Sequence, residues 1–217
     1  MTAQAHLDTL VTVFGGSGFL GRHVVHALAK RDYRIRVAVR RPDLAGFLQP
    51  LGRVGQIHAV QANLRHPGSV AAAVRDAKAV INVVGILFER GAQRFEAVQS
   101  FGAETVARAA AAAGAAVVHV SAIGADANSV SLYAQTKARG EQAVLAAAPT
   151  ATIFRPSIIF GEDDEFVNRL VGIVRKAPVI PVLGNGLGLL QPIWVRTLSP
   201  ASCRACRILR LSARPTK

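Results

Sequence analysis

The sequence FGGSGFLG at residues 14–21 follows an apolar, strand-like stretch at 10–13 and opens an amphipathic helical pattern. The first glycines permit a tight turn and a close approach of the backbone to a pyrophosphate, and the last lets the helix pack on the strand. The helix N-terminus would face the phosphates with free N–H groups and a positive dipole end. In this setting the pattern predicts a dinucleotide-binding loop rather than an ordinary glycine-rich turn. The expected contacts are Gly15, Ser17, Gly18, Phe19, Leu20 and Gly21.

The second predicted strand ends in Arg40 and Arg41, and no acid occurs before Asp43. A site that prefers NAD usually places Asp or Glu here to bind the ribose 2′-hydroxyl, whereas a 2′-phosphate needs a cation. A guanidinium offers a planar fork of donors that suits a phosphate dianion. We therefore predict that NADP(H) is favoured over NAD(H), with both arginines among the cofactor contacts. The alternative is that they are solvated residues at the mouth of a loop.

Short β-branched runs alternate with helical patterns through residue 154. The predicted strands are Leu10–Phe14, Ile35–Val39, Ile57–Gln61, Ala79–Val84, Ala116–Ser121 and Ala151–Phe154. The predicted helices are Phe19–Lys30, a short one at Asp43–Leu48, Ser69–Arg75, Phe95–Ala113 and Tyr133–Ala147. Such alternation requires crossover connections, so it predicts an α/β fold: a Rossmann-type, doubly wound parallel sheet with helices on both faces.

Composition restricts the class of protein. The 217 residues can bury one substantial core, and no apolar run approaches the roughly 18 to 20 residues of a membrane-spanning helix. The start, residues 1–8, lacks the pattern of a secretory signal, so we expect a cytoplasmic protein. The net charge of +13 suits acidic headgroups or an acidic partner. Nucleic acid is not expected as a partner, because no interleaved aromatics or known nucleic-acid module accompany that charge.

A possible catalytic set follows the glycine loop in the chain. Tyr133 and Lys137 are four residues apart at the start of a predicted helix, so both project from one face. The ammonium is expected to lower the pKa of the phenol toward a value useful for proton transfer. Ser121, at the end of a predicted strand, could bind the same substrate oxygen. The alternative is a packed tyrosine beside a solvated lysine.

These motifs together resemble the extended or atypical short-chain dehydrogenase/reductases, over residues 9–195. The resemblance implies that residues 15–21 form the nucleotide loop and that Ser121, Tyr133 and Lys137 are the catalytic set. It also implies that residues 82–85 line the cofactor and that Asn63 and Leu64 contact adenine, although the family usually has an acid where Asn63 stands. The further cofactor contacts implied in this way are Val84, Gly85, Lys137 and Arg155.

Within that family the chain most resembles the NAD(P)-binding accessory subunits of respiratory complex I and their bacterial relatives, through residues 84–88, 153–169 and 191–195. Members of that branch hold NADPH without established turnover. This implies an accessory or assembly role beside NADH:ubiquinone oxidoreductase, peripheral to the cytoplasmic face of the inner membrane. The implied partners are complex I subunits or an anionic membrane surface. The alternative is an active NADP-dependent reductase, epimerase or dehydratase that uses the Ser-Tyr-Lys set on an unknown substrate.

We expect three segments: an NAD(P)-binding Rossmann domain at 1–160, a truncated or altered substrate lobe at 161–195, and a basic, disordered tail at 196–217. The tail turns abruptly to Arg, Ser, Pro and Cys where the family would continue with an acid and further elements. It shows no consistent apolar period. A reading-frame change or a truncated gene would explain it, and sequencing the locus tests this. A clean downstream frame without homologous coding sequence would contradict the idea.

Three other features carry no functional expectation, and we predict no metal site. Cys203 and Cys206 form a Cys-x-x-Cys pair, but neither a βαβ setting nor two further ligands accompany them. His119 stands in an apolar run and is expected in the core. The acids at 162–165 are expected to form a solvated loop.

Overall fold

The computed structural model describes residues 8–164, 166–176 and 189–212. Its centre is an all-parallel sheet of six strands in the order β3-β2-β1-β4-β5-β6. The strand order reverses between β1 and β4, which is where a doubly wound sheet opens a ligand crevice. The predicted fold class is therefore confirmed. The strands are β1 (Leu10–Phe14), β2 (Arg34–Val39), β3 (Ile57–Gln61), β4 (Ala79–Asn82), β5 (Ala116–Val120) and β6 (Thr152–Phe154).

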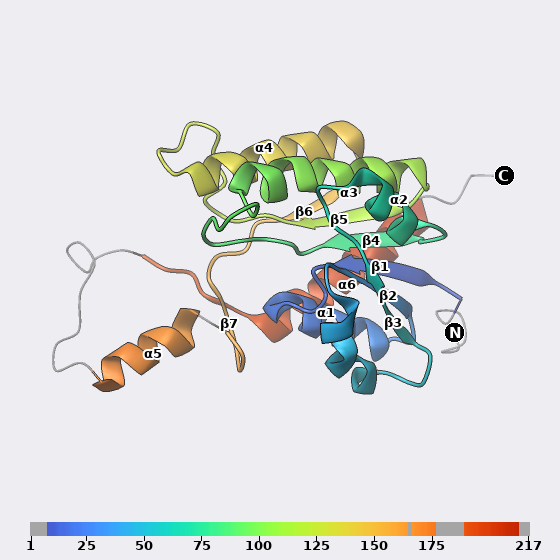
Figure 1. The fold of residues 1–217 in the computed structure, drawn as a ribbon, viewed down its shortest axis with the longest axis horizontal. Helices are drawn as coiled ribbons and strands as arrows, with labels where there is room; N and C mark the ends of the chain where they lie inside the picture. Colours follow the sequence, from blue (N-terminus) through green and yellow to red (C-terminus); the bar gives the residue numbers. More distant parts are fainter. Residues whose placement is uncertain (1–7, 165, 177–188, 213–217) are drawn as a thin grey trace.

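Helices cover both faces of the sheet (Figure 1). On one face lie α1 (Phe19–Ala29) and α6 (Val195–Ser212), with the 3₁₀ segment η2 (Pro42–Leu51) beside α1. On the other lie α2 (Pro67–Val74), α3 (Phe101–Ala112) and α4 (Leu132–Ala147). Each face has its own apolar cluster. All five residues of β1 are buried, as expected of a central parallel strand covered on both sides.

Most predicted boundaries differ from the structure by one to three residues, and two of the differences bear on the site. The strand predicted to reach Val84 ends at Asn82, because the chain there bends into the loop that borders the cofactor cleft. The helix predicted over 95–113 begins as a π-helical turn, η3 (Glu96–Ser100), and becomes α-helical at Phe101. The predicted stop is confirmed, since Gly114 adopts a φ of +64° directly after the helix, a conformation that favours glycine.

The described residues of 159–164, 166–176 and 189–194 include a second, smaller group of elements. The strands β7 (Ile159–Phe160) and β8 (Ile193–Trp194) pair in parallel, and α5 (Phe166–Lys176) lies between them in the chain. In Figure 1, α5 lies at the lower left, apart from the layered body. The domain boundaries at 160 and 195 stay predictions.

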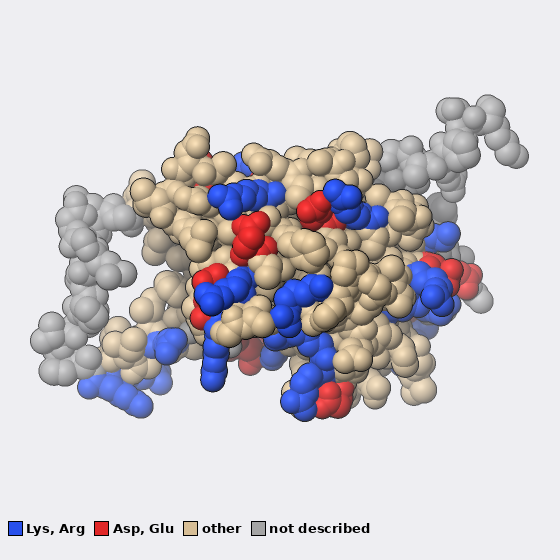
Figure 2. Space-filling view, turned by 45° about the horizontal axis from the view of Figure 1, so that its top comes forward, with Lys and Arg blue, Asp and Glu red and all other residues tan. Residues whose placement is uncertain are grey.

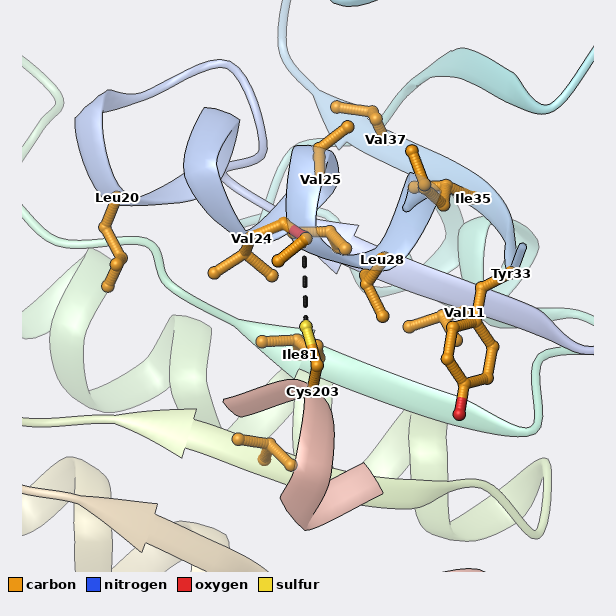
Figure 3. Close-up of a cluster of buried hydrophobic side chains, with 14 of the residues drawn as sticks. Val11, Leu20, Val24, Val25, Leu28, Tyr33, Ile35, Val37, Ile81 and Cys203 are labelled. Carbon is orange, nitrogen blue, oxygen red and sulfur yellow. Dashed lines mark hydrogen bonds between the residues drawn. The ribbon is translucent and has the colours of Figure 1, made fainter. Parts of the chain in front are cut away.

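The expectation of a disordered tail is wrong for the part of it that the structure describes. Residues 195–212 form α6, which packs against α1 and buries Leu198, Ser202 and Cys203. In Figure 3 the thiol of Cys203 points at α1, with its Sγ 4.0 Å from the carbonyl oxygen of Val24. The buried stripe follows a helical period, but small side chains provide most of it, so a search for large apolar residues misses it.

Candidate functional site: a nucleotide cleft beside a Ser-Tyr-Lys set

A cavity of about 240 Å³ opens at the carboxyl ends of β1, β2, β3 and β4. A second cavity, of about 470 Å³, adjoins it and shares Arg40, Gly85, Ile86 and Gln93 with its lining. The second cavity is largely apolar, because Phe19, Leu87, Phe88, Ile159 and Phe166 also line it. The sheet thus presents one continuous cleft where ligands bind in folds of this class.

The glycine loop has the geometry that phosphate binding requires. Gly15 has a φ of +78°, and the amide of Gly18 donates to the carbonyl oxygen of Gly15 at 3.0 Å. A Cβ at Gly21 would lie only 2.1 Å from that same oxygen, so no other residue fits there. No side chain in the described part of the chain caps the first turn of α1, and that turn has no acid. Its N–H groups are therefore available to an anion.

Eight of the predicted cofactor contacts line the first cavity: Gly15, Ser17, Gly18, Arg40, Asn63, Leu64, Val84 and Gly85. The other predicted contacts lie elsewhere. Phe19 lines the second cavity, whereas Leu20 and Gly21 are buried where α1 packs on the sheet. Arg155 forms a bidentate ion pair with the buried carboxylate of Glu141, and both oxygens of Glu141 accept from its Nε at 3.0 Å.

The two arginines after β2 have different surroundings. Arg41 is paired with the carboxylate of Asp43 at 2.8 Å, outside the lining of the cleft. The hydrogen bond that the Arg41 guanidinium donates to the carboxylate of Asp43 raises the pKa of Arg41. Arg40 lines both cavities. A third arginine, Arg65, also lines the first cavity, and its Nε is buried without a hydrogen-bond partner among the described residues. Sequence reasoning missed Arg65, although it directly follows the predicted adenine contacts.

The loop after β4 is held by a buried asparagine. The Oδ1 of Asn82 accepts from the amide of Val84 at 3.1 Å, and its Nδ2 lies 3.3 Å from the Nδ1 of His119. This loop passes Gly15, since a Cβ on that glycine would lie 3.0 Å from a methyl of Val84. His119 is buried on β5, as expected, and burial lowers its pKa to about 3, so the ring is neutral near pH 7.

The predicted catalytic residues gather around the end of β5 and the start of α4. Ser121 is buried, and its Oγ has no hydrogen-bond partner within the part of the chain that the structure describes. Lys137 is buried as well, and its Nζ donates to the carbonyl oxygen of Val120 at 3.3 Å. A Cβ on Gly85 would lie 3.5 Å from that Nζ, so the lysine reaches the border of the cofactor cleft.

The expected lowering of the tyrosine pKa is wrong for this state of the protein. Burial raises the pKa of Tyr133, whose ring packs edge-on against Phe95 at 5.8 Å. The Nζ of Lys137 lies 6.0 Å from the centre of the tyrosine ring. Burial lowers the pKa of Lys137 to about 8, with the Glu141 carboxylate opposing that change. The lysine is still mostly charged near pH 7, yet at this distance its ammonium does not offset the burial of the phenol.

Sequence reasoning also missed a polar contact that fixes the helices around this set. Gln99, buried at the end of η3, donates from Nε2 to the carbonyl oxygen of Ile86 at 2.7 Å. Its Oε1 accepts from the hydroxyl of Thr136 at 3.2 Å. Gln99 therefore connects the cleft loop to α4. The sequence does carry a signal of this contact, because Gln99 and Thr136 are polar residues at positions where the helical pattern predicts apolar ones.

The acids at 162–165 were expected to form a solvated loop; of the three that the structure describes, Glu162 and Asp163 are exposed, whereas Asp164 is buried. Asp163 pairs with Arg22 at 3.1 Å and Glu162 with Arg196 at 2.9 Å. Asp164 is buried, and its side chain accepts from backbone amides at the start of α5. Their carboxylates are occupied by cations and amides, so they serve the structure of the loop.

The fold and the site define a nucleotide-binding protein of the short-chain dehydrogenase/reductase type. The chain belongs to the family described as the RmlD substrate binding domain, which matches residues 9–209. Proteins of this class bind a nicotinamide dinucleotide. The resemblance to atypical reductases of this class is therefore confirmed. No helix in the described ranges is long and apolar enough to cross a membrane.

Among its relatives, the chain is 38% identical to a ceramide reductase of Caulobacter vibrioides, over 81% of this chain and 54% of that protein. It is 34% identical to the mitochondrial NADH dehydrogenase [ubiquinone] 1 alpha subcomplex subunit 9 of Arabidopsis thaliana, over 91% of this chain and 50% of that protein. The chain thus spans about half the length of these relatives. The X-ray structure of Pen from Bacillus thuringiensis superposes with a TM-score of 0.78 at 20% identity, covering 92% of this chain and 65% of that one.

Proposed function

We propose that the chain holds NADP(H) in the cleft at the carboxyl end of the sheet and prefers it to NAD(H). The preference rests on Arg40, which lines the cleft where a ribose 2′-phosphate would lie and whose strand end has no acid. Arg65 supports it as a second guanidinium in the same lining, because its Nε has no hydrogen-bond partner in the described part of the chain. Arg41 contributes less to this preference than the sequence predicts, because its guanidinium is already paired with the carboxylate of Asp43.

The residues present fit the cofactor. The uncapped start of α1 and the close approach of Gly15 and Gly21 suit its pyrophosphate, and the apolar residues Leu64 and Val84 suit its rings. Asn63, in place of the usual acid, is compatible with adenine, since an amide can donate and accept. When bound, the cofactor supplies hydride chemistry. Lys137 would hold a ribose hydroxyl, and Ser121 and Tyr133 would bind and protonate a carbonyl oxygen.

We place this cofactor-holding protein beside NADH:ubiquinone oxidoreductase, in an accessory or assembly role. The support is the likeness to relatives named as complex I subunits, at 34% and 33% identity in Arabidopsis thaliana and Neurospora crassa. The implied partners are subunits of that complex or an anionic membrane surface at the cytoplasmic face. Bound cofactor would then stabilise the fold rather than turn over.

A second candidate function is an active NADP-dependent reductase. Two observations favour it. The Oγ of Ser121, in a complete Ser-Tyr-Lys set, has no hydrogen-bond partner among the residues that the structure describes, and the chain is similar to a ceramide reductase. The apolar second cavity would suit a long-chain ketone. We expect that NADPH consumption with such a ketone, if present, falls at least about a hundredfold in Tyr133→Phe while NADPH binding is kept. No consumption by the wild-type chain with intact NADPH binding would favour the accessory role.

The preference for NADP(H) is tested by titrating nicotinamide fluorescence at fixed salt with NADPH and with NADH. We expect Arg40→Ala to weaken NADPH binding about tenfold to a hundredfold, the value of one charge-assisted pair, and to leave NADH binding nearly unchanged. Arg41→Ala is the matched control, and we expect less than a threefold change. Equal losses in both variants, or equal affinity of the wild-type chain for both cofactors, would contradict the assignment.

A further inference from the structure

The helix α5 has an apolar face that nothing in the described structure covers. None of its eleven residues is buried. At 100° per residue its apolar side chains occupy an arc of about 160°. The large members of that arc are each 42–46% exposed: Phe166, Leu170, Val171, Ile173 and Val174. A soluble helix that packs on its own domain would bury such a face.

Cations border both edges of this face. Arg175 follows one edge of the apolar arc, and Arg169 and Lys176 follow the other, whereas no Asp or Glu occurs at 166–176. The two residues at the C-terminal end also suit the helix dipole. In Figure 2 basic side chains stand on this helix, at the lower left of the molecule. An apolar face bordered by long cationic side chains is typical of helices that lie in a membrane interface.

We propose that α5 docks the protein on an anionic bilayer, lying flat with its apolar face among the acyl chains and its three cations at the headgroups. This names the surface that would meet the anionic membrane partner proposed above, and it does not depend on cofactor binding. At eleven residues, about 16 Å, the helix is too short to span a bilayer and is suited only to the interface. The charge pattern favours this occupant over a second copy of the chain, since two cationic edges would repel each other.

The start of α5 lies at the second cavity, so docking of this helix also affects where the cavity lies. Phe166, its first residue, lines the second cavity together with Leu87 and Phe88. These two residues are 70% and 68% exposed, so the mouth of the cavity is apolar. A helix docked through the face that includes Phe166 would bring this mouth close to the headgroups.

The test is co-sedimentation of the full chain with vesicles of phosphatidylcholine alone and with phosphatidylglycerol added. We expect binding only to the anionic vesicles, and weaker binding at high salt. The apolar variant Leu170→Asp and the neutral triple variant Arg169→Gln, Arg175→Gln, Lys176→Gln should each bind at least about tenfold more weakly. Val54→Asp is the matched control, since Val54 is an exposed apolar residue outside α5, and this variant should bind normally.

Circular dichroism and NADPH titration of the same variants show that they fold, and they separate this proposal from cofactor binding. Three results would overturn it: no binding of the wild-type chain to anionic vesicles, unchanged binding in both α5 variants, or a dimer in light scattering that Leu170→Asp converts to a monomer. The second result would assign binding to other cations, and the third would assign the face to a second copy of the chain.

Discussion

Lys137 combines two requirements that conflict in one side chain. Its ammonium must reach the cleft, yet it is buried, and its one acceptor within the described ranges is the carbonyl oxygen of Val120. Burial therefore lowers its pKa from 10.5 to about 8. Such a shift corresponds to at most about 3 kcal/mol of destabilisation when the side chain is charged. A buried charged group that lowers the free energy of unfolding is typical of functional sites.

The cost has a defined pH dependence. Between about pH 8 and 10.5 the unfolded chain holds a proton on this lysine that the folded chain has released, so the free energy of unfolding rises with pH. Below pH 8 both states are protonated and the penalty is constant. We expect Lys137→Met to raise the free energy of unfolding at pH 7 by about 1–3 kcal/mol, with a smaller gain at pH 9.5. Urea titrations at both values measure this.

Lys78→Met is the control for that measurement, since Lys78 is exposed, and it should change stability by less than about 0.5 kcal/mol at either pH. Comparison with wild type removes the opposing effect of Cys203, whose raised pKa, about 12, makes stability fall above pH 9. A gain that is equal at pH 7 and pH 9.5 would show that Lys137 is not the source of the shift.

At the level of single residues, the sequence indicated where the candidate site residues lie, but not their ion pairs or pKa shifts. The order of glycine loop, Ser121, Tyr133 and Lys137 in the chain predicted residues that the structure places at the end of β5 and the start of α4, and their catalytic role stays a prediction. The separation of Arg40 from Arg41 and the rise in the pKa of Tyr133 depend on neighbours: the Asp43 carboxylate in one case and burial in the other. Spacing in the chain carries no information about such neighbours.

At the level of elements, α6 shows how a helix can be missed. Its buried positions include Leu198, Ser202, Cys203 and Ala205, which repeat at helical spacing but are mostly small. Small residues permit close approach of two helices, and Val24 and Ala27 of α1 belong to the same apolar cluster. Arg196 and Arg204 lie on the exposed side, and the segment resembles a basic tail when composition alone is considered. The reading-frame change or truncated gene that the composition of this segment suggests stays a prediction.

The packing of α6 predicts the reactivity of a thiol. In a Cys206→Ser variant, which leaves Cys203 as the single cysteine, we expect DTNB to react at least about a hundredfold more slowly than in the urea-unfolded chain. The reasons are that Cys203 is only 1% exposed and that burial raises the pKa of its thiol to about 12. The rate of absorbance change measures it. Reaction as fast as in the unfolded chain would show that α6 does not pack as described.

At the level of the whole molecule, the alternation of strands and helices was sufficient to predict the sheet and its two helical layers. Each crossover leaves the chain few alternatives once the strands are parallel and the connections right-handed. The pairing of β7 with β8 and the position of α5 could not be predicted, because two-residue strands and an isolated amphipathic helix give no pattern that specifies where they lie. Those parts depend on contacts between distant segments.

The contact between α6 and α1 joins the far end of the chain to the helix whose first turn faces the cleft. A ligand that binds only the ordered N-terminus of α1 must raise the free energy of any opening that disorders this helix, by about 2.7 kcal/mol at a hundred times its dissociation constant. Cys203 is buried against Val24 of α1, so such an opening exposes it. Its thiol is therefore an internal reporter of occupancy, coupled by thermodynamic linkage to a cleft that it does not touch.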